Sequence, residues 1–505
     1  MKRISLEGCN RIRAHRLVRH LVGTFFLAVL ASIFLCGTAD AQDLAPVFVP
    51  GTCDLPNVAA VAVRLRCGTV RVPREQARPQ AGTFALAVVI IASEQQPALS
   101  DPVVYINGGP GEPLTVYAAA QARTAYAPGR DLILVDQRGT GHSEPAICPD
   151  HERVLFAANI AFAAEDTSDT VEARRAAYVG CRDEAIRRGL DLTNFGTSVT
   201  VEDFEWVRRA LGIARWNVYG ESYGTTVAMS LAALHAETVR SLVLDSIYPP
   251  EPQPLWSATV AQAREALFAH CAKDAACAAS YPDLHAMYRQ AVSRLRQDPL
   301  WVELPPQLRQ YSERAQITAD LFETLLSRML YFPPTYPRLP LVIKSVGKGD
   351  GGDLRRIIAA EFAAARTQSR GTHAAVECRD RPHFREPLPD GADVLDRIQL
   401  YGICATWAEL GPAPRVAAET PVPTLVLSGQ FDPVSGPALS RHAAAMLGPA
   451  ARLVVFPRLG HNIRQFSPCG TRIAAAFIDD PQRAPDTSCV DRRPTIRFES
   501  NPEKG

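Results

Sequence analysis

The chain has 505 residues, a formal net charge of +1 and 47% hydrophobic residues. This length is enough for a sizeable core and for two or three domains. The near-zero charge, with no basic run interleaved with aromatic residues after residue 41, argues against a nucleic-acid partner.

The first 41 residues are expected to be a secretory signal peptide (residues 1–41). A basic start is followed by the apolar run Leu21–Cys36, and Ala39–Ala41 is a small-x-small cleavage site before Gln42. A membrane anchor is the alternative, but the apolar run is short for a membrane span. We therefore expect an exported protein, periplasmic or secreted, with no stable membrane anchor after cleavage.

Of the 12 cysteines, only Cys9 and Cys36 lie in this signal, and an even number remains. An even number in an exported protein indicates disulfides, although the sequence does not determine their pairing. The simplest arrangement joins each cysteine to the next: Cys53–Cys67, Cys148–Cys181, Cys271–Cys277, Cys378–Cys404 and Cys469–Cys489. Neither Cys-x-x-Cys nor His-Glu-x-x-His occurs, so no metal site is indicated.

Apolar runs in the first third of the chain predict the strands of a mostly parallel sheet. After Phe84–Ile91, the run Val103–Ile106 leads into Asn107–Gly111, and Asp131–Val135 leads into Asp136–Ser143. Strands that end in glycine-rich loops and alternate with helices are typical of a parallel α/β sheet. The ligand site of such a sheet lies at the carboxyl ends of the strands.

The segment Gly220–Gly224 has the pattern Gly-x-Ser-x-Gly, between an apolar strand and a helix expected over Thr226–Leu234. This is the context of a nucleophile elbow, in which Ser222 occupies a strained turn. Side chains at the two flanking positions would clash, which explains the two glycines. The helix N-terminus favours a developing anion. The alternative is a glycine-bordered turn with a solvent-exposed serine.

The composition changes at the proline-rich segment Tyr248–Pro254, after which the apolar spacing is helical. We expect a helical cap over residues 252–371, inserted between a first core part, 42–251, and a second core part, 372–505. A separate downstream domain is the alternative. Strand patterns that return after the helical region favour the insertion.

The returning strands carry two further candidates for catalysis. Asp432 follows the strand Thr424–Ser428, and His461 follows the next strand. Ser222, Asp432 and His461 stand in the chain order of an α/β-hydrolase triad. His461 would take the serine proton, and Asp432 would hold the imidazole in the correct tautomer. Asp245, at the end of the strand after the nucleophile strand, is a rival acid, although a role in capping a loop or supporting the hinge of the cap is preferred for it.

The tetrahedral oxyanion of such a reaction needs two N–H donors. Tyr223, the residue after the nucleophile, supplies one. The loop Asn107–Gly111 is expected to supply the other. Pro110 has no N–H, so Gly108 or Gly109 is the expected source, and of the two we expect Gly109.

Five motifs together resemble the proline iminopeptidase family, and within it the exported tripeptidyl-aminopeptidase-like branch. They are Asn107–Gly111, Asp136–Ser143, Gly220–Gly224, Ser428–Val434 and Gly460-His461. The segments Cys67–Pro73, Ala375–Cys378 and Cys404–Trp407 also fit that branch. The resemblance covers most of the chain after the signal except the cap. It implies an α/β-hydrolase fold and release of amino-terminal residues or short peptides, without metal or cofactor.

The chain departs from the family at two places beside the oxyanion loop. The family often has histidine where this chain has Asn107, and small residues where it has Glu112 and Pro113. Glu112 is expected either to bind the free amino terminus of a peptide or to be a solvated loop residue. A carboxylate is a natural partner for a protonated amine, so the first role would suit an aminopeptidase.

The leading expectation is an exported serine aminopeptidase that acts through an acyl-enzyme on Ser222, with a peptide or a small ester or amide as substrate. A carboxylesterase or amidase with the same triad is the alternative, because the family includes members that act on esters and other amides. A catalytically inactive binding module is a third possibility. The intact Ser222, Asp432 and His461 argue against it.

Overall fold

The computed structural model describes residues 45–124, 128–164, 167–248, 255–306, 309, 313–365, 367–390, 392–411, 419–492 and 495–500. The expected signal peptide lies outside these residues. In the described part of the chain, no helix is both long and apolar enough to cross a membrane.

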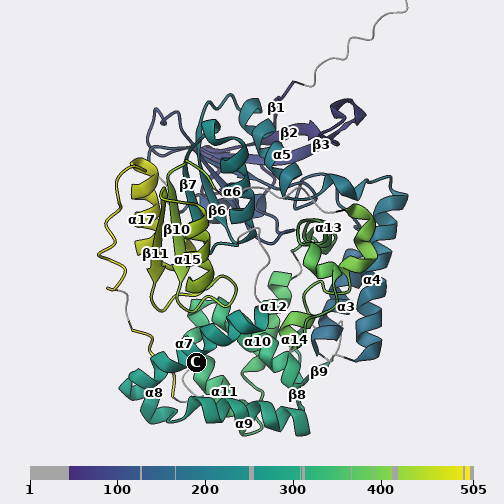
Figure 1. Cartoon of the computed structure of the whole chain (residues 1–505), viewed down its shortest axis with the longest axis vertical. Helices are drawn as coiled ribbons and strands as arrows, with labels where there is room; N and C mark the ends of the chain where they lie inside the picture. Colours follow the sequence, from purple (N-terminus) through teal and green to yellow (C-terminus); the bar gives the residue numbers. More distant parts are fainter. Residues whose placement is uncertain are drawn as a thin grey trace, which may run out of the picture. The chain divides into compact units, whose positions relative to one another are not determined.

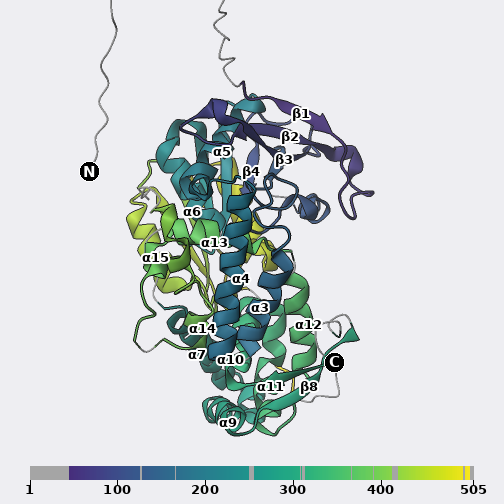
Figure 2. The same ribbon diagram turned by 90° about the vertical axis from the view of Figure 1, so that its right-hand side faces the viewer.

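A nine-stranded sheet forms the core (Figures 1 and 2), with the strand order β1-β2-β3-β5-β4-β6-β7-β10-β11. The strands are β1 Phe48–Gly51, β2 Leu65–Pro73, β3 Thr83–Ile91, β4 Val103–Ile106, β5 Leu132–Val135, β6 Trp216–Glu221, β7 Val239–Asp245, β10 Thr424–Gly429 and β11 Ala451–Phe456. From β5 to β11 in this order all neighbours run parallel, and antiparallel pairing is confined to β1, β2, β3 and the junction with β5. The predicted mostly parallel α/β sheet is confirmed.

Helices cover both faces of this sheet, which explains why β4 and β5 are apolar along their whole length. Side chains of α5 Thr197–Ala210, α6 Tyr223–Leu234 and α15 Pro437–Met446 pack on one face. Side chains of α2 Ala118–Gln121 and α17 Pro468–Asp479 pack on the other face. The carboxyl ends of the parallel strands therefore remain as the accessible edge for a site.

Residues 255–365 form a mostly helical region with a hydrophobic cluster of its own. The helices are α7 Trp256–Lys273, α8 Ala275–Ser280, α9 Leu284–Gln297, α10 Ala319–Tyr331, α11 Leu339–Gly347 and α12 Leu354–Ala365. We call this region the cap; it lies in the lower half of Figure 1. It also contains an unexpected antiparallel pair, β8 Leu300–Glu303 and β9 Arg314–Ile317. The boundaries expected for the insertion stay a prediction.

Two long helices between β5 and α5 extend from the core towards the cap (Figure 2). They are α3 Glu152–Ala164 and α4 Ser168–Arg187. Phe156 of α3 belongs to the hydrophobic cluster of the cap, whereas α4 packs on α13 Arg370–Asp380. The short helix α14 Val394–Arg397 also contributes to the cap cluster. Segments from both core parts therefore complete the packing of the cap.

Disulfides join the described cysteines in consecutive pairs along the chain, as expected from the simplest arrangement. They are Cys53–Cys67, Cys148–Cys181, Cys271–Cys277, Cys378–Cys404 and Cys469–Cys489. Two of them lie in one buried cluster, where a Cβ added at Gly371 would come within 2.8 Å of the Cys148 sulfur and 3.0 Å of the Cys181 sulfur. Helix α13 thus packs directly against the disulfide that anchors α4.

Residues 495–500 return from the core to the cap, and we call them the C-terminal strap. Ile496 and Phe498 pack against the hydrophobic cluster of the cap. The Glu499 N–H donates to the carbonyl of Pro337 at 2.9 Å, and the Glu499 carboxylate lies 3.4 Å from Arg338. Figure 1 shows the yellow end of the chain passing from α17 to the cap helices.

Candidate active site

Ser222 lies in the turn between β6 and α6 with φ 53° and ψ −126°, a conformation that is strained for an L-residue. Its neighbours explain why the flanking positions are glycine. A Cβ at Gly220 would lie 2.6 Å from the carbonyl oxygen of Gly224, and a Cβ at Gly224 would lie 2.1 Å from that of Ile106. The turn has the geometry that the sequence predicted for a nucleophile elbow.

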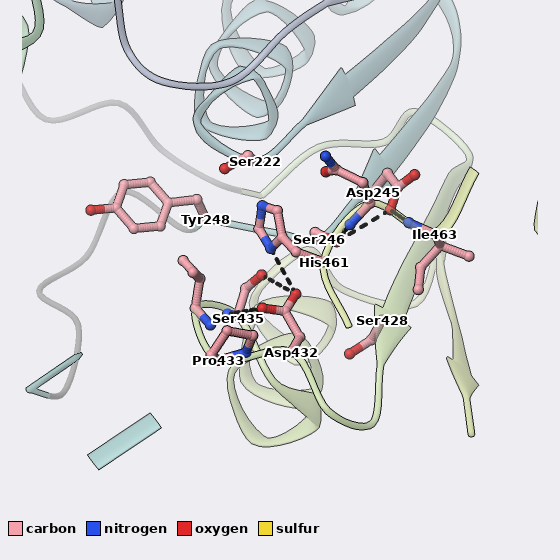
Figure 3. Close-up of polar contacts among 12 residues, drawn as sticks. Ser222, Asp245, Ser246, Tyr248, Ser428, Asp432, Pro433, Ser435, His461 and Ile463 are labelled. Atoms are coloured by element: carbon pink, nitrogen blue, oxygen red, sulfur yellow. Dashed lines mark hydrogen bonds and ion pairs between the residues drawn. The ribbon is translucent and has the colours of Figure 1, made fainter. Parts of the chain in front are cut away.

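Asp432 and His461 meet because they follow the adjacent parallel strands β10 and β11. The Nδ1 atom of His461 lies 2.9 Å from the Oδ2 atom of Asp432, and both side chains are buried (Figure 3). The second Asp432 oxygen accepts hydrogen bonds from the N–H groups of Val434, at 2.8 Å, and Ser435, at 2.9 Å. The hydroxyl of Ser435 donates to Oδ2 at 2.9 Å. The carboxylate is therefore fixed in its ionised form.

These contacts set the pKa of both groups. Burial alone would raise the pKa of Asp432, but the charge and hydrogen bond of His461 and the two backbone N–H groups lower it below its ordinary value. Burial alone would lower the pKa of His461, but the charge and hydrogen bond of Asp432 raise it above its ordinary value. The pair therefore favours a carboxylate beside a basic imidazole.

The other imidazole nitrogen, Nε2, is buried and has no hydrogen-bond partner among the described residues. In Figure 3, Ser222 lies on the side of the His461 ring that faces away from Asp432. The structure thus brings the three predicted triad candidates into the order serine, histidine, aspartate. An imidazole held in this way can accept a proton from a hydroxyl on its open side.

The loop Asn107–Gly111 lies directly against the elbow. A Cβ at Gly108 would come within 2.8 Å of the Ser222 Cβ atom. The side chain of Asn107 holds the loop closed, since its amide donates to the carbonyl of Glu112 at 2.9 Å and to that of Pro113 at 3.3 Å. The residues that distinguish this loop from the family pattern therefore contact one another. The choice of Gly109 as the N–H donor stays a prediction.

Glu112 follows this loop, and its side chain is accessible to water. The surrounding protein nevertheless removes enough solvent to raise the pKa of its carboxyl, and the positive charges of Arg328 and His461 partly offset this rise. Arg328 belongs to α10 of the cap, so Glu112 lies where the cap faces the triad. This position combines access to solvent with proximity to His461.

Two residues near His461 were not predicted from the sequence. Tyr331, the last residue of α10, places its ring 4.4 Å from the imidazole ring at an interplanar angle of 35°. Glu221 accepts a hydrogen bond from the hydroxyl of Tyr105 and lies 3.8 Å from the guanidinium of Arg464. Glu221 stood beside the serine in the motif, but Tyr331 reaches the site only through the packing of the cap, which no local pattern indicates.

Asp245, the rival acid, does not contact the His461 imidazole. Its carboxylate accepts hydrogen bonds from the hydroxyl of Tyr219 and from the backbone N–H groups of Ile463 and Arg464. Asp432 is therefore the acid that lies against the imidazole. Among the described residues, no group of three or more His, Cys, Asp or Glu side chains could hold a metal ion.

A serine in a strained elbow, a histidine–aspartate pair after later strands and a mostly parallel sheet define a class of hydrolases. The chain belongs to the α/β-hydrolase fold family, whose model matches residues 101–464. The match includes all three triad candidates.

Three relatives carry peptidase names. The chain is 32% identical over 199 residues to a tripeptidyl aminopeptidase of Streptomyces coelicolor, covering 37% of this chain and 36% of the relative. It is 27% identical over 413 residues to the serine protease Hip1 of Mycobacterium tuberculosis, covering 72% and 75%. It is 29% identical over 157 residues to a proline iminopeptidase of Neisseria meningitidis, covering 31% and 36%. The family resemblance expected from the motifs is confirmed.

Proposed function

We propose that this protein is an exported serine aminopeptidase that releases N-terminal residues or short peptides. The observation that carries the proposal is the buried hydrogen bond between His461 and Asp432. The Nε2 atom of His461 has no hydrogen-bond partner among the described residues, and Ser222 lies on the side of the ring away from Asp432 (Figure 3). The similarity to a tripeptidyl aminopeptidase and a proline iminopeptidase supports the choice of peptides as substrates.

In the proposed reaction, the Ser222 hydroxyl attacks the carbonyl carbon of the scissile bond while His461 Nε2 takes its proton. Asp432 stabilises the imidazolium that forms. The tetrahedral intermediate collapses when His461 returns the proton to the leaving amine, which leaves an acyl group on the Ser222 oxygen. Water, activated by the same imidazole, then hydrolyses the acyl-enzyme.

The negative oxygen of the tetrahedral intermediate would accept hydrogen bonds from the backbone N–H groups of Tyr223 and Gly109. Such preorganised donors commonly supply one of the largest contributions to catalysis. The close approach of Gly108 to the elbow supports this role for the loop, since a Cβ at Gly108 would lie 3.3 Å from the Ser222 hydroxyl oxygen.

Glu112 is proposed to bind the protonated amino terminus of the substrate. Its carboxylate lies close enough to the triad to interact with the charge of His461. Its access to water, together with partial desolvation by the surrounding protein, suits a site that exchanges water for an ammonium group.

Export is the last part of the proposal. Disulfides persist in oxidising compartments such as the periplasm and the extracellular medium. The five disulfides support a periplasmic or secreted protein, in keeping with the signal peptide expected over residues 1–41.

Covalent labelling by a fluorophosphonate tests the nucleophile. We expect stoichiometric labelling of the wild type at Ser222, none in Ser222→Ala and very slow labelling in His461→Ala. Turnover should fall about 10⁴-fold or more in either variant, and the double variant should lose little more because the residues act as a unit. A wild-type protein that is not labelled would be a binding module and not a serine hydrolase.

A substrate panel tests the reaction class. Peptide amides with a free amino terminus, their acetylated counterparts and simple aryl esters should be compared by kcat/KM. We expect the free-amine peptides to be the best substrates. Higher values for the esters, with no preference for a free amine, would establish an esterase that uses the same triad.

A further inference from the structure

The end of β7 is the point where the parts of the site converge. Asp245 is the last residue of β7 and lies opposite Glu221 of β6 on one side and Leu427 of β10 on the other. The two neighbours of β7 are therefore β6, which leads to the proposed nucleophile, and β10, which leads to the proposed acid. The backbone carbonyl of Asp245 accepts the Ser222 N–H at 3.0 Å.

The Asp245 side chain holds a different segment, the residues His461–Arg464, which we call the histidine loop. Its Oδ1 atom accepts the N–H of Ile463 at 2.8 Å (Figure 3). Its Oδ2 atom accepts the N–H of Arg464 at 3.0 Å. The hydroxyl of Tyr219 donates to Oδ2 at 2.8 Å. The carboxylate is fully buried, so each of these contacts is made without competition from water.

Ser246 extends the same arrangement by one residue. Its hydroxyl oxygen accepts the N–H of Asn462 at 2.9 Å. Ser246 has φ 58° and Asn462 has φ 64°, so two adjoining segments both adopt left-handed backbone to make this contact. Three consecutive backbone N–H groups directly after His461 are thus accepted by Asp245 and Ser246.

We propose that Asp245 and Ser246 are positioning residues, which hold the histidine loop so that the His461 imidazole faces Ser222. One residue, Asp245, binds the nucleophile through its backbone and the loop of the base through its side chain. The inference rests on the proposed serine-hydrolase function. Asp432 orients the ring of His461 from one side, and the end of β7 holds the backbone that carries the ring.

Asp245→Asn is the informative variant. Both carboxylate oxygens accept a loop N–H, so an amide in either orientation leaves one of these N–H groups without its acceptor. Proton transfer is sensitive to small displacements, and kcat per active site should fall roughly 10- to 100-fold while KM changes by less than about threefold. The rate of fluorophosphonate labelling should fall in parallel.

Tyr219→Phe is the matched control. It removes the hydroxyl that donates to Asp245 but keeps both bonds to the histidine loop. We expect kcat within roughly threefold of the wild type. Active sites are to be counted by the stoichiometry of fluorophosphonate labelling, because a purely structural defect would lower the number of sites and leave kcat per site unchanged.

Two results would overturn the inference: wild-type kcat per site in Asp245→Asn, or an equal loss in Tyr219→Phe. If Asp245→Asn does not fold, the deciding variant is Ser246→Ala. It removes the acceptor of the Asn462 N–H and the hydroxyl that donates to Asp245 Oδ1 at 3.3 Å, but keeps both bonds from Asp245 to the histidine loop. It should lower kcat per site roughly three- to tenfold. An unchanged kcat there would also reject the inference. A Ser222→Ala variant with full activity would instead reject the proposed function itself.

Discussion

At His461, two opposing effects determine the pKa of the imidazole. Burial disfavours the charged ring, and the neighbouring Asp432 carboxylate favours it more strongly, so the pKa lies above the ordinary value of 6.5. The ring must be neutral to take a proton from Ser222. Activity should therefore be lost as the pH falls through this raised pKa.

Asp432→Asn tests this balance. The acidic limb of kcat/KM in the wild type should have an apparent pKa above the ordinary value of 6.5. Without this carboxylate, burial is opposed only by the charges of Glu221 and Asp245, so the limb should move to lower pH. The value of kcat should fall about 10⁴-fold, because the imidazole tautomer is no longer held. The measurement is a pH–rate profile of both proteins. A limb that stays in place would show that Asp432 does not set the basicity of His461.

Glu112→Gln tests the proposed amine site on two substrates that differ only in acetylation of the amino terminus. For the free peptide, kcat/KM should fall roughly 10- to 150-fold, which corresponds to the loss of one charged hydrogen bond of about 1.5–3 kcal/mol. The acetylated peptide should be hardly affected. Equal losses of kcat/KM on both substrates would show that Glu112 does not bind the amino terminus and acts only within the loop.

The elbow and the two later candidates could be proposed from the sequence because each is a local pattern at the end of an apolar strand. Ser222, Asp432 and His461 could be found from such patterns. Tyr331 could not be found in this way, and the loop-capping role preferred for Asp245 left open which loop is capped, because both depend on which segments meet in three dimensions. When a carboxylate binds backbone N–H groups, its partners cannot be identified from the sequence, because almost every residue has a backbone N–H.

Among the elements, the end of α10 packs so closely against Gly460, the residue before the histidine loop, that there is no room for a side chain at this position. A Cβ there would lie 2.2 Å from the Tyr336 hydroxyl and 2.6 Å from the carbonyl oxygen of Leu330. Both contacts belong to the cap, and Leu330 directly precedes the Tyr331 that covers His461. The position of the cap is therefore coupled to the position of the base.

Gly460→Ala should separate these elements. We expect a loss of roughly 1–3 kcal/mol in the free energy of unfolding, because the backbone on either side must shift to admit the methyl group, and a lower kcat. Gly347→Ala is the control: the nearest atoms would lie 3.8 Å from the new Cβ, so stability should be unchanged or slightly raised. Thermal unfolding and kcat of both variants are the measurements. Equal stability of the two variants would contradict the close packing.

The strands could be predicted where they are apolar throughout, as in β4 and β5. Helix α4 was missed because its buried face includes charged residues, which obscure the hydrophobic period. Arg174, for example, is satisfied by backbone carbonyls such as that of Ile398, at 2.7 Å. Strand β8 has only four residues with an exposed Trp301, too short a pattern to recognise.

At the scale of the whole molecule, the C-terminal strap links the core to the cap. Deletion of residues 495–505 should lower the free energy of unfolding by roughly 1–3 kcal/mol, because Ile496 and Phe498 leave the cap cluster. Deletion of 501–505 alone keeps both side chains and serves as the control. Denaturant unfolding of the two truncated proteins checks this. If deletion of residues 495–505 left the free energy of unfolding unchanged, the strap would not stabilise the cap.

The pairing of each cysteine with its nearest neighbour in sequence has a consequence for how the chain matures. The bridges span 14, 33, 6, 26 and 20 residues, and none encloses a cysteine of another bridge. A chain that emerges from a translocation channel N-terminus first would present each native partner before the next cysteine arrives. An oxidase acting in strict order of emergence would then form only native bridges. With the export proposed above, formation of these bridges should accordingly depend on a thiol oxidase and be largely independent of a disulfide isomerase.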